Sequence, residues 1–334
     1  MVVGRLGGLG QAVHERDRVG EAVEGELALE RPFDLAPSLG SGHEAKYAGL
    51  SGRARLFERS RKDTPTTELV CEHVYRPLAH LVVLALLPLR VPPPAVVAAA
   101  GCTGLAAAVE LARGHLVVAS LLLVAKTVLD NADGQLARAS GRVSALGRYL
   151  DSESDLLVDA ALFAALGYST GRPIAAAAAF LALTLVLGVN FNLRRLYRLE
   201  RGQAAEALPP AEGVAAVLRR AYAVVYGPQD RLVEAFVEWR LRRLRADAGA
   251  RLAYHDRPTL VVLHNLGLSG QLTALALCLA VGRPELYLWL ALACGLALLP
   301  LALRRDVRAR RERRSPSIPQ PTRKEQTCST TPGT

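Results

Sequence analysis

The sequence has 334 residues, of which 51% are apolar and 22% are charged. Its formal net charge is +10, from 41 Lys and Arg residues against 31 Asp and Glu residues. Aromatic residues make up only 5%, and neither zinc-finger spacing nor an RNP-like motif occurs, which excludes the common nucleic-acid modules. The five cysteines are scattered and odd in number, which argues against a disulfide framework or a cysteine metal cluster.

The N-terminal region divides into two parts. Residues 1–65 mix Gly, Arg, Glu and Ser without a sustained period and contain no apolar signal-peptide core. We expect a disordered leader there, or a start codon assigned too early. Residues 66–93 contain the stretch HLVVLALLPL, which is too short to cross a bilayer, so we predict an N-terminal interfacial helix.

Windows of about 20 mostly apolar residues follow, as expected of membrane-spanning helices. We predict six spans, at residues 94–112, 114–131, 147–168, 174–192, 259–281 and 285–303. The third window begins with several acids, so it can span only if they face protein or water. The connections GRPI and GRPE (171–174 and 282–285) indicate helical hairpins. The predicted fold class is therefore all-α, a polytopic membrane protein with six transmembrane helices and the N-terminal interfacial helix.

Basic residues lie mainly on one side of these spans. The short turns on one side contain only Arg113, Arg172 and Arg283, whereas residues 193–258 contain 13 Lys and Arg. The positive-inside rule therefore predicts a bacterial-type cytoplasmic (inner) membrane protein whose termini and 129–155 segment are cytoplasmic. Within the insert, residues 230–247 carry apolar side chains at helical spacing opposite a basic face. An interfacial helix and a solvated helix packed on the protein both fit this pattern.

Acidic residues gather between the second and third predicted spans, in LDNADGQLARASGRVSALGRYLDSESD (129–155). Asp130 and Asp133 are three residues apart and Asp151 and Asp155 are four apart, so each pair shares a helical face. Glu153 points elsewhere. A hairpin between the two helices brings four carboxylates together, and their repulsion near lipid becomes tolerable when divalent cations lie among them. Oxygen ligands favour Mg²⁺ or Mn²⁺ over zinc, and two such ions suit a displacement at phosphorus.

Two further residues suit a phosphorylated ligand. Gly134 has no side chain to hinder the approach of a ligand to the backbone. Arg138 offers a fork of donors for phosphate oxygens, although an anchor under the positive-inside rule is the alternative. Asp159, one turn beyond Asp155, fits a polar network as well as it fits a metal contact.

The segment resembles the CDP-alcohol phosphatidyltransferase family, whose signature is D-x2-D-G-x2-A-R-x8-G-x3-D-x3-D. It is matched without a gap by Asp130, Asp133, Gly134, Ala137, Arg138, Gly147, Asp151 and Asp155. The six-span layout extends the resemblance over residues 70–305. The family's usual Pro-Asn and Thr at the first span are replaced here by PPPAVVAAAGCTG, which leaves the identity of the acceptor open.

The resemblance implies roles for the matched residues. Asp130, Asp133 and Asp151 are expected to be metal ligands, and Asp155 to be the general base that also shares the metals. The cytidine diphosphate part of the donor is expected to lie against Gly134, Ala137 and Arg138. Gly147 is expected to let the two helices approach each other.

The resemblance also implies an enzyme that transfers a phosphatidyl (substituted phosphate) group from a CDP-linked donor to an alcohol, releases CMP and serves phospholipid biosynthesis. We expect CDP-diacylglycerol as the donor, two Mg²⁺ or Mn²⁺ ions as the cofactor, and membrane lipids around the protein. A homodimer is left open. The alternatives are transfer of a CDP-activated head group to a lipid or inositol phosphate acceptor, and a cation transporter.

The corresponding domain plan has a leader (1–65), an interfacial helix (66–93), a catalytic membrane domain (94–305, with the insert 193–258) and a disordered basic tail (306–334). Other polar residues have two interpretations each. Lys126 fits a side chain that extends toward the membrane surface, although it lies one turn before Asp130. His264 and Asn265 fit an acceptor pocket or a packing role. Five arginines fit either a site for an acceptor phosphate or simple placement under the positive-inside rule: Arg142, Arg148, Arg194, Arg195 and Arg198.

Overall fold

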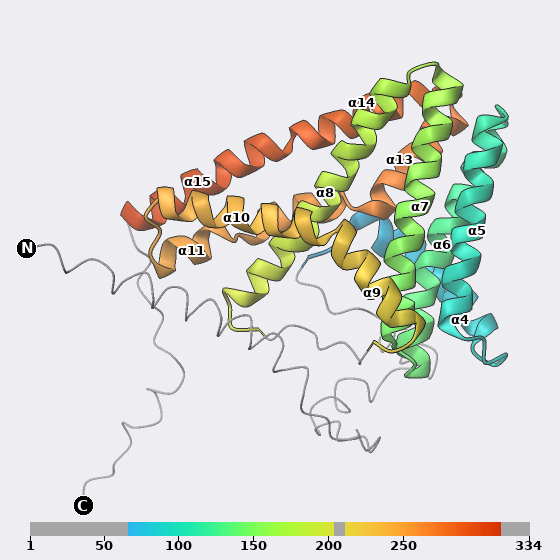
Figure 1. The fold of residues 1–334 in the computed structure, drawn as a ribbon, viewed down its shortest axis with the longest axis horizontal. Coiled ribbons are helices and arrows are strands. Elements are labelled where there is room, and N and C mark those ends of the chain that lie inside the picture. The colour runs from blue at the N-terminus through green and yellow to red at the C-terminus, as the bar shows by residue number, and fades with distance from the viewer. Residues whose placement is uncertain (1–65, 204–210, 315–334) are drawn as a thin grey trace, which may run out of the picture. The chain divides into compact units, whose positions relative to one another are not determined.

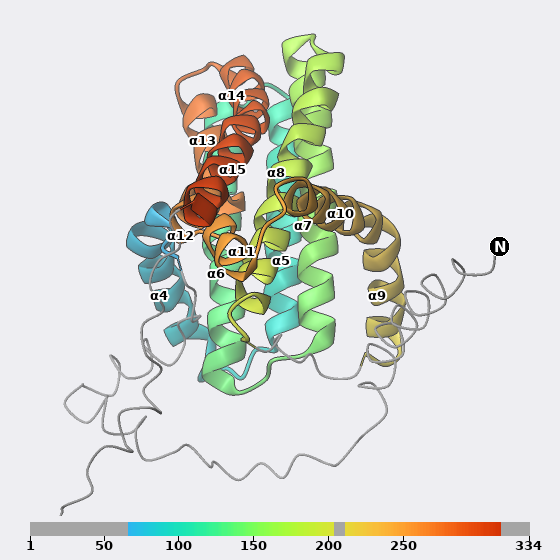
Figure 2. The same ribbon diagram turned by 90° about the vertical axis from the view of Figure 1, so that its left-hand side faces the viewer.

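The computed structural model describes residues 66–203 and 211–314, and every regular element in these residues is a helix (Figures 1 and 2). A π-helical turn, Cys71–Tyr75, leads into α4. The α-helices are α4 (Arg76–Leu86), α5 (Pro93–Ala112), α6 (Leu116–Ser140), α7 (Ala145–Thr170), α8 (Pro173–Leu199), α9 (Val214–Val225), α10 (Gly227–Arg243), α11 (Ala248–Tyr254), α12 (Arg257–Asn265), α13 (Leu268–Ala280), α14 (Pro284–Leu296) and α15 (Leu298–Arg314). The all-helical fold class is confirmed for this part of the chain.

The two Gly-Arg-Pro connections are tight turns, as the sequence predicts. Gly171 ends α7 in the left-handed conformation (φ 67°), and Arg172 N–H donates to the carbonyl of Gly167 across 3.0 Å. Pro173 then begins α8 at a position where no N–H is needed. Gly282 (φ 71°) and Pro284 repeat this arrangement between α13 and α14. Each tripeptide thus ends one helix and begins the next, antiparallel one.

Helices α5, α6 and α7 pack unusually closely because α5 has glycines where it faces its neighbours. A Cβ atom on Gly104 would lie 2.5 Å from Val158 Cγ1 on α7 and 3.3 Å from Lys126 Cγ on α6. A Cβ atom on Gly101 would lie 2.3 Å from Ser154 Oγ. Helix α5 thus holds both α6 and α7 closely, along turns that carry the acidic residues.

Four segments of the described residues are long and apolar enough to cross a membrane: Pro93–Ala112, Pro173–Leu199, Ala248–Ala280 and Pro284–Arg314. They correspond to four of the six predicted spans. The remaining two predicted spans fall on α6 and α7, which have 25 and 26 residues and are therefore about 37–39 Å long. Both helices carry acidic and basic residues within their apolar stretches, and they are not among the four.

The fifth predicted span, residues 259–281, is not one continuous helix. Chain direction changes between α12 and α13, where a Cβ atom on Gly267 would lie 2.8 Å from the His264 carbonyl oxygen. The sixth is also divided: Pro300, in the first turn of α15, has no N–H to continue the hydrogen-bond ladder of α14.

The expected boundary of the basic tail needs a correction. Residues 306–314 are not part of a disordered tail, because α15 continues through them to Arg314. Asp306 accepts two hydrogen bonds from Arg240 of α10, and Ala309 is buried in a cluster with α8, α10, α11 and α12. Residues 1–65 and 315–334, expected to be a leader and a tail, lie outside the described residues.

The segment 230–247 packs on the protein through α10. Val237 and Leu241 are buried in the cluster that contains Ala309. A second apolar strip on the same helix, with Leu232, Phe236 and Trp239, remains exposed. The packing interpretation therefore holds for one face of α10, while the other face still offers apolar surface.

Candidate active site

The α6–α7 hairpin brings together three of the four predicted carboxylates. Gly141 ends α6 in the left-handed conformation (φ 68°), and the Ser144 hydroxyl caps α7 by accepting from Gly147 N–H at 3.1 Å. Across this short connection, one carboxylate oxygen from each of Asp130, Asp151 and Asp155 lies within 4.8 Å of the other two. This spacing allows all three acids to contact one cation.

Asp133 is not part of this group of three, but it lies one turn further along α6. Its side chain is buried, and Oδ2 has no hydrogen-bond partner among the described residues. A buried carboxylate oxygen without a partner is costly, which is the situation that a bound cation would relieve. The four acids therefore offer an all-oxygen donor set of the kind that Mg²⁺ and Mn²⁺ prefer.

Lys126 has a place in this cluster that the sequence alone did not assign. Its ammonium group donates to Asp130 Oδ1 at 3.1 Å and to Asp155 Oδ1 at 2.5 Å. The side chain is only 1% exposed, so it does not extend to the membrane surface. The position four residues before Asp130 is the signal that could have indicated this contact.

The residues expected to hold the donor occupy the last turns of α6. A Cβ atom on Gly134 would lie 3.2 Å from Arg138 Nη1, so the guanidinium group lies against the glycine. The carbonyl of Ala137 accepts from Arg142 N–H at the end of the helix. Gly147 has a different role from the expected one, because a Cβ atom there would meet only Ser144 Oγ within 4 Å among the described residues. Gly101 and Gly104 on α5 instead let that helix approach α7 and α6 closely.

A cavity of about 420 Å³ opens beside the acidic cluster. Asp130, Asp155 and Asp159 line it, together with Arg194 and His264. Further polar residues complete much of the wall: Glu68, Ser152, Thr184, Asn190, Tyr222, Tyr226, Asp230 and Ser269. Asp159 and His264 thus belong to the cavity, and Arg194 is the one of the five candidate arginines that lines it.

Tyr226 closes part of the cavity wall. Burial raises the pKa of its phenol above the usual range, so the hydroxyl remains protonated. It donates a hydrogen bond to the carbonyl of Ser152 at 3.2 Å. The hydrogen bond ties the start of α10 to the α7 turn between Asp151 and Asp155.

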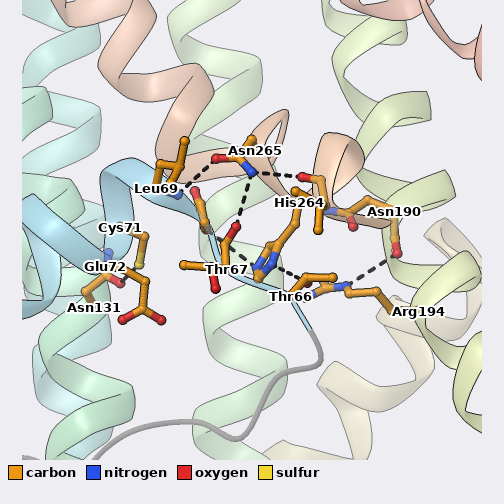
Figure 3. Close-up of polar contacts among 12 residues, drawn as sticks. Thr66, Thr67, Leu69, Cys71, Glu72, Asn131, Asn190, Arg194, His264 and Asn265 are labelled. Atoms are coloured by element: carbon orange, nitrogen blue, oxygen red, sulfur yellow. Dashed lines mark hydrogen bonds and ion pairs between the residues drawn. The ribbon is translucent and has the colours of Figure 1, made fainter. Parts of the chain in front are cut away.

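Residues 66–72, which we call the N-terminal strap, lie against α12 and α6 (Figure 3). Thr66 Oγ1 lies 2.7 Å from His264 Nδ1. The Asn265 side chain accepts from Leu69 N–H at 2.9 Å and donates to the carbonyl of Thr67 at 3.1 Å. Burial raises the pKa of Cys71 to about 11, and the protonated thiol donates to Asn131 Oδ1. His264 therefore faces the cavity, whereas Asn265 has a structural role.

Comparison with known proteins finds a family whose sequence pattern includes this site. Residues 90–236 match the CDP-alcohol phosphatidyltransferase family, and they contain both helices of the acidic hairpin. The match covers 147 of the 334 residues and contains the whole 130–155 signature. The match confirms the resemblance carried by the 130–155 signature, and both comparisons support a transferase of substituted phosphate groups. Together with the four apolar segments, the family match identifies an integral membrane protein.

A curated relative from Thermococcus kodakarensis, named as a bifunctional IPC transferase and DIPP synthase, is 41% identical over 81 residues. The match covers 24% of this chain and 19% of the relative. The chain therefore matches about a fifth of the length of that protein.

Proposed function

We propose that this phosphatidyltransferase moves a phosphatidyl group from CDP-diacylglycerol to an alcohol acceptor and releases CMP, as a step in phospholipid biosynthesis. The observation that supports it best is the group of three carboxylates within 4.8 Å of one another at the wall of a polar cavity. The cavity provides room for an acceptor directly beside the acids.

In this proposal, Asp130, Asp133, Asp151 and Asp155 hold Mg²⁺ or Mn²⁺, with two ions shared among them. The ions would supply positive charge to neutralise the diphosphate and stabilise the leaving CMP. Arg138, with Gly134 and Ala137 beside it, orients the cytidine diphosphate part of the donor. Its fork of N–H groups suits phosphate oxygens.

Asp155 is the proposed general base. It takes the proton from the acceptor hydroxyl as the alcohol oxygen attacks the phosphorus that bears the diacylglycerol. The bond from this phosphorus to the CMP oxygen breaks, and CMP leaves with the bonding electrons. Asp155 lines the cavity, which places its carboxylate where an acceptor hydroxyl would enter.

We further propose that α6 and α7 cross the membrane with the four apolar segments, which gives six spans. Their charged residues face the interior cluster and each other, which reduces the cost of placing them near lipid. The excess of basic residues beside the hairpin supports a cytoplasmic active site in a bacterial-type inner membrane. In this arrangement α4, which exposes Leu78 and Leu81, lies at the membrane interface.

The alternative within the family is transfer of a CDP-activated head group to a lipid or inositol phosphate acceptor. The Thermococcus relative is named as both a transferase and a synthase, which makes this alternative worth testing beside the first. A cation transporter is less well supported, because transport calls for polar groups distributed along a path through several spans. Here the clustered acids lie on one hairpin.

The test is CMP release by the purified protein in lipid, with CDP-diacylglycerol and a panel of alcohols, with and without Mg²⁺. We expect CMP release that needs both the metal and an alcohol. A second arm supplies CDP-linked head groups with a diacylglycerol or inositol phosphate acceptor. Activity only in this arm would favour the alternative, and activity in neither would overturn the proposal.

A further inference from the structure

The N-terminal strap brings a carboxylate into the cavity from outside the family's matched region, which begins at residue 90. The strap is fixed in place by hydrogen bonds to residues nearly 200 positions away, from Thr66 to His264 and from Leu69 to Asn265 (Figure 3). Glu68 lies between these two anchored residues. The hydrogen bonds of Thr66 and Leu69 therefore fix the backbone position of Glu68 on both sides.

The two carboxylate oxygens of Glu68 have different surroundings. Oε2 lies 3.7 Å from Nε2 of His264, which also lines the cavity. Oε1 is buried and has no hydrogen-bond partner among the described residues. Among the described residues, the acids close enough to share one cation are Asp130, Asp151 and Asp155, and Glu68 is not one of them. A metal ion bound to those three acids therefore does not account for the unpartnered Oε1 of Glu68.

A ligand that satisfies Oε1 must donate a hydrogen bond, because an ionised carboxylate only accepts. Asn190 on the same wall also has a buried side-chain oxygen, Oδ1, without a hydrogen-bond partner among the described residues. An alcohol with a hydrocarbon chain would leave Glu68 Oε1 and Asn190 Oδ1 without partners, which is how a polar site rejects an apolar analogue. An acceptor with several hydroxyl groups would satisfy them.

We infer that Glu68 is a specificity-determining residue which accepts a hydrogen bond from a second hydroxyl of a polyhydroxylated acceptor, while Asp155 takes the proton from the attacking hydroxyl. This inference rests on the proposed function and names the class of acceptor. The strap, which lies outside the 90–236 family region, thus contributes to the choice of substrate. A direct consequence is that acceptors with more hydroxyl groups are turned over more efficiently, and that this preference depends on Glu68.

The experiment measures CMP release with acceptors that share a carbon skeleton and differ in hydroxyl number. One series is 1-propanol, 1,2-propanediol and glycerol, and the other is cyclohexanol, inositol and inositol phosphate. The wild-type protein is expected to use the polyols with a kcat/KM at least about tenfold above that for the monohydroxy alcohols, as expected for a hydrogen bond to a charged group. Glu68→Gln should lose most of this preference by a rise in the acceptor KM, with the KM for CDP-diacylglycerol unchanged.

Glu72→Gln is the matched control, because Glu72 is a carboxylate of the same strap that pairs with Arg76 and does not line the cavity. It should retain the wild-type preference. If Glu68→Gln does not fold, as judged by thermal unfolding, Glu68→Asp withdraws the carboxylate by one methylene and should show the same selective rise in acceptor KM.

The outcomes separate the inference from the proposed function. CMP release that favours monohydroxy alcohols, or an unchanged preference in a folded Glu68 variant, overturns the inference and leaves the proposed function standing. An equal loss toward donor and acceptor assigns Glu68 a structural role and also overturns it. No CMP release by the wild type with any alcohol overturns both.

Discussion

Lys126 and Asp155 form an ion pair across the α6–α7 interface, with Nζ 2.5 Å from Oδ1. The same ammonium group lies 3.1 Å from Asp130 Oδ1. One lysine therefore neutralises part of the charge on two of the three clustered carboxylates. The protein itself supplies a cation at the site where a metal is proposed to bind.

Lys126→Met should destabilise the metal-free protein, because it leaves Asp130 and Asp155 facing each other without the ammonium group. The two carboxylates are 19% and 21% exposed, so we expect a loss of about 3 kcal/mol, the low end for a broken buried pair. Thermal unfolding in detergent measures it. Added Mg²⁺ should raise the melting temperature of the variant more than that of the wild type.

The control for this variant is Arg113→Met, which removes an ion pair with Glu110 from an exposed turn. An exposed pair contributes at most about 1 kcal/mol, so the melting temperature should change little. Equal melting temperatures for Lys126→Met and the wild type without metal would contradict the role given to Lys126.

Gly104→Ala should destabilise the helix packing beneath the site. The new methyl group would lie 2.5 Å from Val158 Cγ1, and this β-branched, buried side chain has little freedom to move. We expect a loss of about 1–3 kcal/mol from overpacking, measured as a lower melting temperature. Gly227→Ala is the matched control, because its Cβ atom would meet nothing within 4 Å. A melting temperature equal to that of the control would contradict the packing account.

Local sequence spacing was enough to predict the hairpin and most of its acids. The i, i+4 spacing of Asp151 and Asp155 and the two glycines of the connection lead to the observed arrangement with Asp130. The Gly-Arg-Pro turns were predictable for the same reason, since Gly readily adopts the left-handed conformation that ends a helix and Pro fixes φ at a value suited to the first turn of the next. These features depend on residues that are close in sequence.

Features that depend on contacts between distant segments were not predictable. The burial of Lys126 depends on which face of α6 meets α7, and Gly104 on α5 helps to decide that packing. The strap is held through Thr66 and His264, which are 198 residues apart. A single sequence contains no local signal for such a pairing, so Glu68 was not identified.

Glu68 should also make stability depend on pH. Burial raises the pKa of its carboxyl above the ordinary value of 4.5, so the folded protein retains a proton that the unfolded chain has already lost as the pH rises. The wild type should therefore lose stability relative to Glu68→Gln as the pH increases from about 4.5 toward neutrality. Melting temperatures of the two proteins across this range measure the difference. A wild-type melting temperature that stays constant or rises with pH relative to that of Glu68→Gln would contradict the effect of burial on this carboxyl group.

The most direct test of the proposed site is CMP release by Asp130→Asn and Asp155→Asn in lipid with CDP-diacylglycerol, Mg²⁺ and an alcohol that supports wild-type turnover. Glu153→Gln is the control, since Glu153 lies on the same turn of α7 but belongs neither to the clustered acids nor to the cavity wall as described. We expect both Asp variants to lose at least about 100-fold in rate, in line with the loss of a metal ligand or a general base, and the control to retain activity. Wild-type turnover in both Asp variants would contradict the assignment.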